Sequence, residues 1–124
     1  MPVLLVALGG AAGAVTRYVL DGWISDRAGG TFPWGTLLVN LSGSALLGIL
    51  FALAIERGFL PASVRAPLLI GFLGAYTTFS TLMLESWRLL EDGAVGIAAL
   101  NAFGSVVLGL AAVFVGLTIG RALS

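Results

Sequence analysis

Four apolar runs, each close to the length of a membrane crossing, constrain this chain more than any other feature. They cover roughly residues 2–20, 36–55, 66–90 and 95–123. About 20 apolar residues span a hydrocarbon core about 30 Å thick, and backbone in hydrocarbon must satisfy its own hydrogen bonds, so each run predicts a helix. The mean hydropathy of +1.09 is far above that of a soluble domain. The sequence therefore predicts an all-α membrane protein, with four transmembrane helices in a single domain over residues 1–124.

The residue types that are missing exclude several kinds of chemistry. The chain has no cysteine and no histidine, which removes disulfides, thiolate chemistry and the usual proton shuttle. No nucleophile with a neighbouring base and no cluster of metal-ligating side chains is visible, so an enzyme is not predicted. Six basic residues balance six acidic ones, and we expect no nucleic acid partner.

The third run contains a stretch that a plain lipid-facing helix does not need. Residues 71–81 read GFLGAYTTFST, with two glycines and four threonine or serine side chains. Hydroxyl groups compete with helical backbone pairing, and non-helical backbone in a bilayer is tolerated only at a buried site or a wet cavity. We predict that the third helix is interrupted here, with a non-helical backbone at Gly74. The alternative is an unbroken helix that packs through its small residues.

An internal repeat is visible when the chain is shifted by 61 positions. The shift places Asn40 and Ser44 on Asn101 and Ser105, and it places Gly10, Gly13, Ala14 and Thr16 on Gly71, Gly74, Ala75 and Thr77. The chain thus resembles a duplicated two-helix hairpin, with copies over 1–61 and 62–124, and its short connections favour an antiparallel bundle. Two copies with an even number of spans point the same way, so an inverted pair would require a second subunit.

The arginines give no clear orientation in the membrane. Three are expected at one face, namely Arg57, Arg65 and Arg121, and three at the other, namely Arg17, Arg27 and Arg88. Orientation normally follows an excess of Lys and Arg on the cytoplasmic side, and no excess is predicted here. We therefore expect insertion in both orientations and an antiparallel, dual-topology homodimer. The alternative is that a few charges balance by chance.

Two polar tracks run along the second and fourth spans. Asn40, Ser44 and Gly48 share one helical face because they recur every four residues, and Asn101, Ser105 and Gly109 repeat this face. Such residues can bond neighbouring helices, or they can line a path for an anion, since neutral donors replace a hydration shell without trapping the ion. Phe79 fits an anion path as well, because the edge of an aromatic ring is electropositive.

Three ordered motifs resemble those of the CrcB/Fluc family of fluoride ion channels. They are residues 9–18 (GGAAGAVTRY), residues 33–40 (PWGTLLVN) with Gly43, and residues 71–81. The resemblance covers essentially the whole chain. It implies a dual-topology homodimer that exports fluoride passively through two antiparallel pores in the cell membrane and confers fluoride resistance. It also implies a structural sodium ion at the centre of the dimer.

The resemblance also implies roles for individual residues. The backbone carbonyls of Gly74 and Thr77 would hold the sodium ion. The fluoride pathway would be lined by these residues: Asn40, Ser44, Thr78, Phe79, Ser80, Thr81 and Ser105. Members of the family commonly have a second phenylalanine where this chain has Leu82, so a two-ring aromatic path is in question here.

Two functions of other classes remain open from the residues alone. A small dual-topology drug/proton antiporter would share the size and the bundle, but it needs a carboxylate within the membrane. Glu85, late in the third run, is the only candidate. An assembly subunit without transport activity would explain the glycines but not the paired polar tracks.

Overall fold

The computed structural model describes residues 2–123, and these residues are helical apart from short connections. The elements, in order, are α1 (Pro2–Ala28), α2 (Trp34–Phe51), the π-helical η1 (Ala52–Glu56), α3 (Ala62–Arg65), the π-helical η2 (Ala66–Phe72), α4 (Leu73–Tyr76), α5 (Phe79–Glu91) and α6 (Val95–Leu123). Four helical segments are long and apolar enough to cross a membrane, namely Pro2–Ala28, Trp34–Glu56, Ala62–Glu91 and Val95–Leu123. The predicted all-α architecture with four spans is therefore confirmed.

The helix boundaries differ from the prediction mainly in the first span. α1 continues past Leu20 to Ala28, because no proline interrupts residues 21–28 and the chain turns only at Gly29 and Gly30. Both glycines have positive φ, 63° and 73°, a conformation that side chains disfavour. The two π-helical segments were not predicted. In η2, Pro67 lacks the N–H that a regular α-helical ladder requires, and the wider π turn surrounds it.

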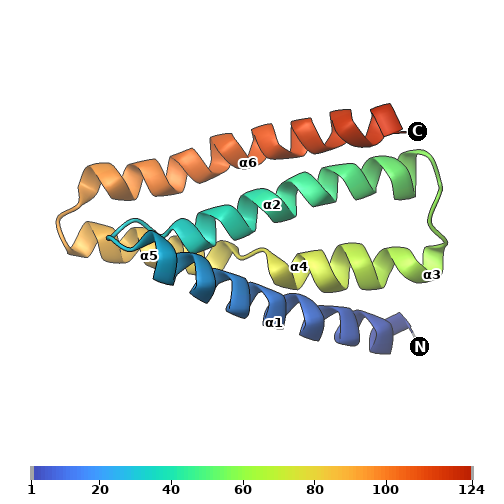
Figure 1. The fold of residues 1–124 in the computed structure, drawn as a ribbon, viewed down its shortest axis with the longest axis horizontal. Coiled ribbons are helices and arrows are strands. Elements are labelled where there is room, and N and C mark those ends of the chain that lie inside the picture. The colour runs from blue at the N-terminus through green and yellow to red at the C-terminus, as the bar shows by residue number, and fades with distance from the viewer. Residues whose placement is uncertain (1, 124) are drawn as a thin grey trace.

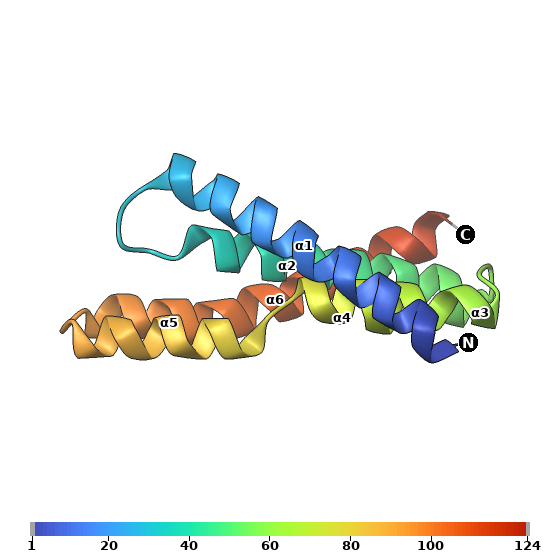
Figure 2. The same ribbon diagram turned by 90° about the horizontal axis from the view of Figure 1, so that it is seen from below.

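The four spans form an antiparallel arrangement in which α2 occupies the centre. Figure 1 shows α6 running alongside α2, with α1 on the opposite side against η2 and α4. α5 packs with α6, and Figure 2 shows these two helices running side by side away from α1. Both ends of the chain and the turn after η1 lie at the same end of the molecule.

Glycines allow the helices to approach at backbone distance. A Cβ atom on Gly71 would lie 2.7 Å from the carbonyl oxygen of Val6, and one on Gly48 would lie 2.6 Å from that of Val113. This close contact is typical of helix packing in membranes, where no hydrophobic force between helices exists. The small buried core contains Val39, Leu73 and Tyr76.

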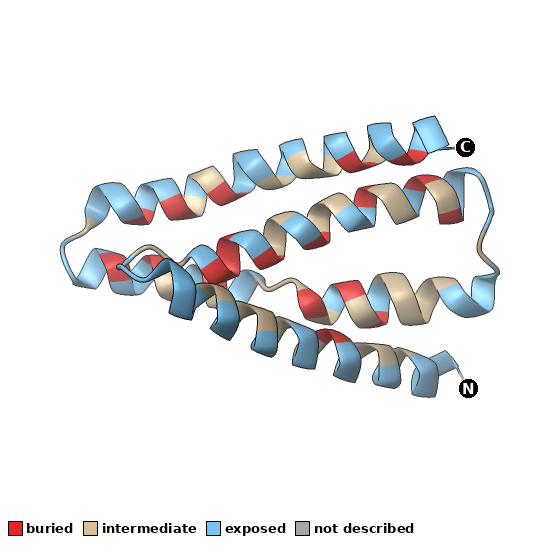
Figure 3. Cartoon of the chain, in the orientation of Figure 1, coloured by how far each residue is buried: buried red, intermediate tan, exposed pale blue. Residues whose placement is uncertain are grey.

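The outer faces of the helices are exposed, as Figure 3 shows along α1 and α6, and they carry many large apolar side chains. Phe103 and Phe114 on α6, for example, are 72% and 69% exposed. A helix that is apolar all round is a membrane span rather than a surface helix. These faces are therefore available to lipid or to a second copy of the chain.

One of the six arginines does not lie where the sequence analysis placed it. Arg17 was assigned to the end of the first span, but it lies within α1 and donates a hydrogen bond to the carbonyl of Ala75. The two faces therefore carry three and two arginines instead of three each. Arg121, at the first of these faces, forms a bidentate pair with Glu56 at 2.8 and 2.9 Å.

Candidate functional site

The third span contains a junction of two residues, Thr77 and Thr78, between α4 and α5. Thr77 has φ −81° and ψ 156°, and Thr78 has φ −147° and ψ 116°, so both are extended. Thr78 caps α5, because its hydroxyl accepts the amide of Thr81 at 3.3 Å. Gly74 lies within α4 and is helical. The expected non-helical backbone at Gly74 is therefore wrong, and the extended residues are the threonines that follow.

Asn40 on α2 binds both backbone polar groups of Thr78, the second residue of this junction. Its Oδ1 accepts the amide of Thr78 at 2.7 Å, and its Nδ2 donates to the carbonyl of Thr78 at 3.0 Å. The side chain thus gives the Thr78 amide a partner in place of the Gly74 carbonyl, which it would meet in a continuous helix, and it adds a second bond to the carbonyl of the same residue. Buried backbone groups need such partners, so Asn40 stabilises the extended conformation of Thr78.

The junction leaves further backbone groups without partners. Within residues 2–123, the N–H groups of Phe79 and Ser80 donate no hydrogen bond, and the carbonyls of Gly74, Tyr76 and Thr77 accept none. The two N–H groups are donors at the N-terminus of α5, the positive end of its helix dipole. The three carbonyls are acceptors near the C-terminus of α4, the negative end of its dipole. One junction therefore presents donors suited to an anion and oxygens suited to a cation.

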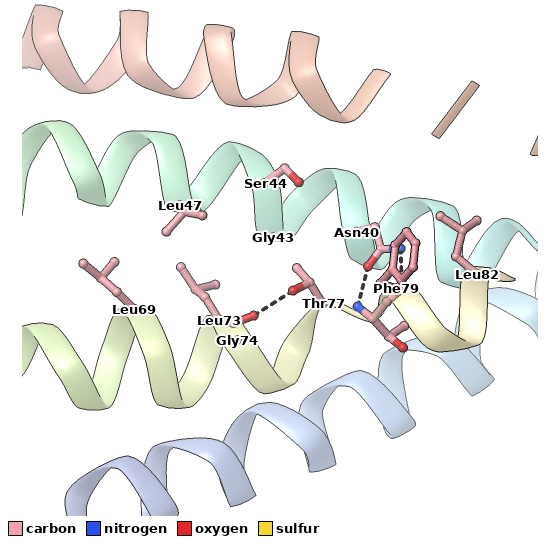
Figure 4. A pocket seen from close by; sticks show the side chains of 11 residues that line it. Asn40, Gly43, Ser44, Leu47, Leu69, Leu73, Gly74, Thr77, Phe79 and Leu82 are labelled. Atoms are coloured by element: carbon pink, nitrogen blue, oxygen red, sulfur yellow. Dashed lines mark hydrogen bonds between the residues drawn. The ribbon is translucent and has the colours of Figure 1, made fainter. Parts of the chain in front are cut away.

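A cavity of about 280 Å³ lies beside this junction, between α2 and the third span. We call it the junction cavity. Figure 4 shows Asn40 and Phe79 close together at one side, with Leu47, Leu69 and Leu73 at the other. The residues that line it are Asn40, Gly43, Ser44, Leu47, Leu69, Leu73, Gly74, Thr77, Thr78, Phe79 and Leu82.

The junction cavity brings together most of the residues predicted from the sequence. Four predicted pathway residues line it, namely Asn40, Ser44, Thr78 and Phe79, as do both predicted sodium ligands, Gly74 and Thr77. Ser80 and Thr81 lie in the first turn of α5 but do not line the cavity. The hydroxyl of Thr77 donates back to the carbonyl of Leu73 at 3.1 Å.

Ser105 lies apart from the junction cavity within the single chain. It is buried on α6, one turn from Asn101, whose Nδ2 donates to Ser86 on α5 at 3.0 Å. The Oδ1 of Asn101 and the Oγ of Ser105 have no partner among the residues that the structure describes. The second polar track therefore faces a different helix from the first, and its role in a pathway stays a prediction.

Glu85 lies in a separate polar region. Its Oε2 accepts a hydrogen bond from Thr36 on α2 at 3.0 Å, and its Oε1 is buried without a partner in residues 2–123. It also lines a second cavity of about 320 Å³, together with Arg88 and Asp92. The carboxylate that an antiporter would need thus lies outside the junction cavity.

Sequence reasoning named Gly43 and Arg17 in the motifs but gave neither of them a role at the site. Gly43 allows α2 to approach the junction, because a Cβ there would lie 3.1 Å from the ring of Tyr76 and closer still to Thr77. Arg17 reaches the third span from α1. The signal for Arg17 was present in the first motif, since Gly9, Gly13 and Arg17 recur every four residues and so share one face of α1.

Comparison with known proteins identifies the family of this chain. Residues 4–117 match the family described as CrcB-like protein, Camphor Resistance (CrcB). The fluoride-specific ion channel FluC of Magnetococcus marinus is 47% identical over 121 residues, 98% of each chain. That of Thermus thermophilus is 49% identical over 120 residues, 97% of this chain and 94% of the relative. That of Hahella chejuensis is 45% identical over 119 residues, 96% of this chain and 94% of the relative.

These matches extend over almost the full length and confirm the resemblance stated above. Together with the four apolar helices, they indicate a multi-pass membrane protein, which in bacteria resides in the plasma membrane. The chain therefore belongs to the CrcB/Fluc family.

Proposed function

We propose that this protein is a fluoride-specific ion channel that lets fluoride leave the cell passively. The names of its close relatives support this function, and so does the junction between α4 and α5. One observation carries the proposal. The N–H groups of Phe79 and Ser80 at the start of α5 donate no hydrogen bond, and they lie close to the side chains of Asn40 and Phe79, which line the junction cavity.

The chemistry of this region suits a small anion. Fluoride is strongly hydrated, so a path must offer several closely spaced donors to replace water, without a fixed positive charge that would hold the ion. The amides of Phe79 and Ser80 are such donors, and they lie at the positive end of the α5 dipole. Half-helix N-termini at mid-membrane are used in this way in other transport proteins.

We further propose that two antiparallel copies form the functional unit and enclose two pores. The ring of Phe79 is 72% exposed in the single chain, and a Cβ on Gly74 would meet no atom within 4 Å. Both residues line the junction cavity, so a second copy would cover it and complete its wall. Three arginines at one face and two at the other impose little orientation, which supports dual topology.

The sodium ion belongs to the same proposal. The carbonyls of Gly74 and Thr77 accept no hydrogen bond from the described residues, and neutral oxygens of this kind suit a hard cation. Two antiparallel copies would bring two such pairs together around one ion. A bound sodium ion would also offset the electrostatic cost of bringing anions to mid-membrane.

Fluoride efflux from liposomes tests the proposed function directly. Purified protein, reconstituted into liposomes loaded with potassium fluoride, should release fluoride rapidly once valinomycin allows potassium to follow. Liposomes loaded with potassium chloride should release little. Release that requires a proton gradient, or equal release of the two halides, would contradict the proposal and favour an antiporter or an unselective pore.

A further inference from the structure

Arg17 brings a charged side chain from α1 to the end of α4, just before the junction. Its Nε donates to the carbonyl oxygen of Ala75 at 3.1 Å, and the side chain is half-buried. Ala75 lies near the middle of the third span, Ala62–Glu91, so the guanidinium lies deep in the membrane. A charge at that depth is costly and is usually retained for function.

The bond replaces a contact that the junction removes. In a continuous helix, the carbonyl of Ala75 would accept the amide of Phe79, four residues on. The extended Thr77 and Thr78 prevent this, and Arg17 supplies the missing donor. The carbonyls of Gly74 and Thr77, on either side, receive no such donor from the part of the chain that the structure describes.

The backbone that carries Arg17 is itself held firmly against the third span. Gly13, one turn earlier on the same face of α1, lies so close to η2 that a Cβ there would be 3.1 Å from the Cα of Phe72. The guanidinium therefore extends from a fixed position. A charge-assisted bond is roughly twice as strong as a neutral one, and a planar guanidinium loses less freedom on bonding than a lysine ammonium does.

No carboxylate in the described part of the chain neutralises the charge of Arg17. The ion pair that is found among residues 2–123 joins Arg121 to Glu56 at one end of the molecule. A neutral donor would satisfy one carbonyl at lower cost in hydrocarbon. The use of arginine indicates that the strength and direction of this bond matter.

We propose that Arg17 is a positioning residue for the sodium site. By holding the carbonyl of Ala75, it fixes the end of α4 and keeps the adjacent carbonyls of Gly74 and Thr77 turned away from the chain's own donors. This inference rests on the proposed function for its sodium ion, but the orientation of the junction can be tested without sodium.

Three variants separate the hydrogen bond from the charge. Arg17→Met removes both, Arg17→Gln keeps a donor without charge, and Arg17→Lys keeps the charge without the planar fork. Arg27→Met is the matched control, because Arg27 is also on α1 but stacks over Trp23, 4.5 Å from its ring centroid, away from the junction. Two quantities are measured in detergent: hydrogen exchange of the amides of residues 77–81, and the rise of the melting temperature with sodium at constant ionic strength.

Arg17→Met should speed exchange at Thr77 and Thr78 by about tenfold or more and raise the sodium concentration for half-maximal stabilisation by a similar factor. In Arg17→Gln and Arg17→Lys, the exchange rates and the half-maximal sodium concentration should lie between those of Arg17→Met and those of the wild type. In Arg27→Met, both quantities should equal those of the wild type. If Arg17→Met does not fold, the same two measurements on Arg17→Gln and Arg17→Lys decide whether Arg17 positions the sodium site.

Unchanged exchange in every Arg17 variant that folds would overturn the positioning role. Slower fluoride flux with unchanged exchange and sodium response would also overturn it, because the charge would then act on the passing ion through space. If the wild type shows no sodium response, the proposed sodium site fails, while the exchange rates still decide whether Arg17 holds the junction.

Discussion

Asn40 and Thr78 are joined by two hydrogen bonds across the gap between α2 and the third span, with the carboxamide of Asn40 accepting the amide of Thr78 at 2.7 Å and donating to its carbonyl at 3.0 Å. This pair fixes the extended residue that precedes α5. It also places a neutral amide beside Phe79 in the junction cavity. The backbone geometry of the junction and the chemistry of the proposed path therefore depend on the same side chain.

Replacing Asn40 with aspartate should suppress fluoride flux. Aspartate can still accept the amide of Thr78 but cannot donate to its carbonyl, and it adds a negative charge. Two like charges about 4 Å apart repel by about 4 kcal/mol at an effective dielectric constant of about 20, well above the ~1.4 kcal/mol that changes a rate tenfold. We expect at least a tenfold fall in efflux from liposomes.

Asn40→Leu is the control for this experiment, because it has a similar shape without the hydrogen bonds or the charge. It should lower the free energy of unfolding by about 1–3 kcal/mol through the unpaired amide of Thr78. Undiminished flux in a folded Asn40→Asp dimer would remove Asn40 from the path.

Phe79→Ala should slow fluoride flux without unfolding the chain. The ring is 72% exposed, so its loss removes little packing within one copy. If its edge faces the anion, the loss of about 0.5–1.5 kcal/mol corresponds to about two- to tenfold in rate. Phe114→Ala on α6, which is 69% exposed, is the matched control and should conduct like the wild type. Equal flux in the two variants would place Phe79 outside the path.

Replacing Gly74 with alanine and replacing Gly71 with alanine should affect different properties of the protein. A Cβ on Gly74 meets nothing within 4 Å of its own chain, whereas one on Gly71 meets the carbonyl of Val6 at 2.7 Å. Gly71→Ala should therefore lower the free energy of unfolding by about 1–3 kcal/mol in any salt. Gly74→Ala should leave the single chain folded but reduce the sodium-dependent rise in melting temperature of the dimer. A Gly74→Ala dimer with an unaltered sodium response would show that no partner packs against this position.

Both orientations should be found in one membrane. Reporter fusions at the C-terminus should score on both sides, since the two faces differ by one arginine. A single added lysine should then shift the balance, and Ser63→Lys and Thr31→Lys, at exposed positions on opposite faces, should shift it in opposite directions. Fusions that all score on one side in the wild type would contradict dual topology.

Hydropathy alone predicted the number and order of the four membrane spans and their helical class, because a bilayer requires helical backbone wherever about 20 apolar residues run together. The last span was predicted with its observed bounds, Val95–Leu123. The π-helical segments and the length of α1 were not predicted. The second π-helical segment, η2, depends on a backbone adjustment around Pro67, and the length of α1 depends on the absence of any strong stop signal before Gly29. Nothing in the sequence explains η1.

The position of the junction could be narrowed to residues 71–81 but not to Thr77 and Thr78. Thr16 and Thr77 match in the repeat, and both donate to a carbonyl four residues earlier, at 2.7 and 3.1 Å. Yet α1 continues through Thr16. The two copies differ after the matched threonine, where Arg17 follows Thr16 but the helix-capping Thr78 follows Thr77. Asn40 then bonds the backbone of Thr78, a contact distant in sequence that local propensity cannot reveal.

The second polar track, Asn101 and Ser105, also shows that a sequence pattern does not reveal contacts between distant segments. The spacing of Asn101 and Ser105 correctly placed both on one face of α6, and both are buried. The sequence could not show which helix that face meets. It meets Ser86 on α5, whereas Asn40 meets the junction.

The central claim is that the protein conducts fluoride passively and selectively, and the reversal potential of the current in a planar bilayer tests it most directly. With fluoride on one side at ten times its concentration on the other, chloride making up the balance and pH equal, the account predicts a reversal potential close to the fluoride equilibrium value of about 59 mV. Changing the pH on one side should not move it. A reversal potential that follows chloride, or one that shifts with the pH gradient, would contradict a fluoride-specific channel.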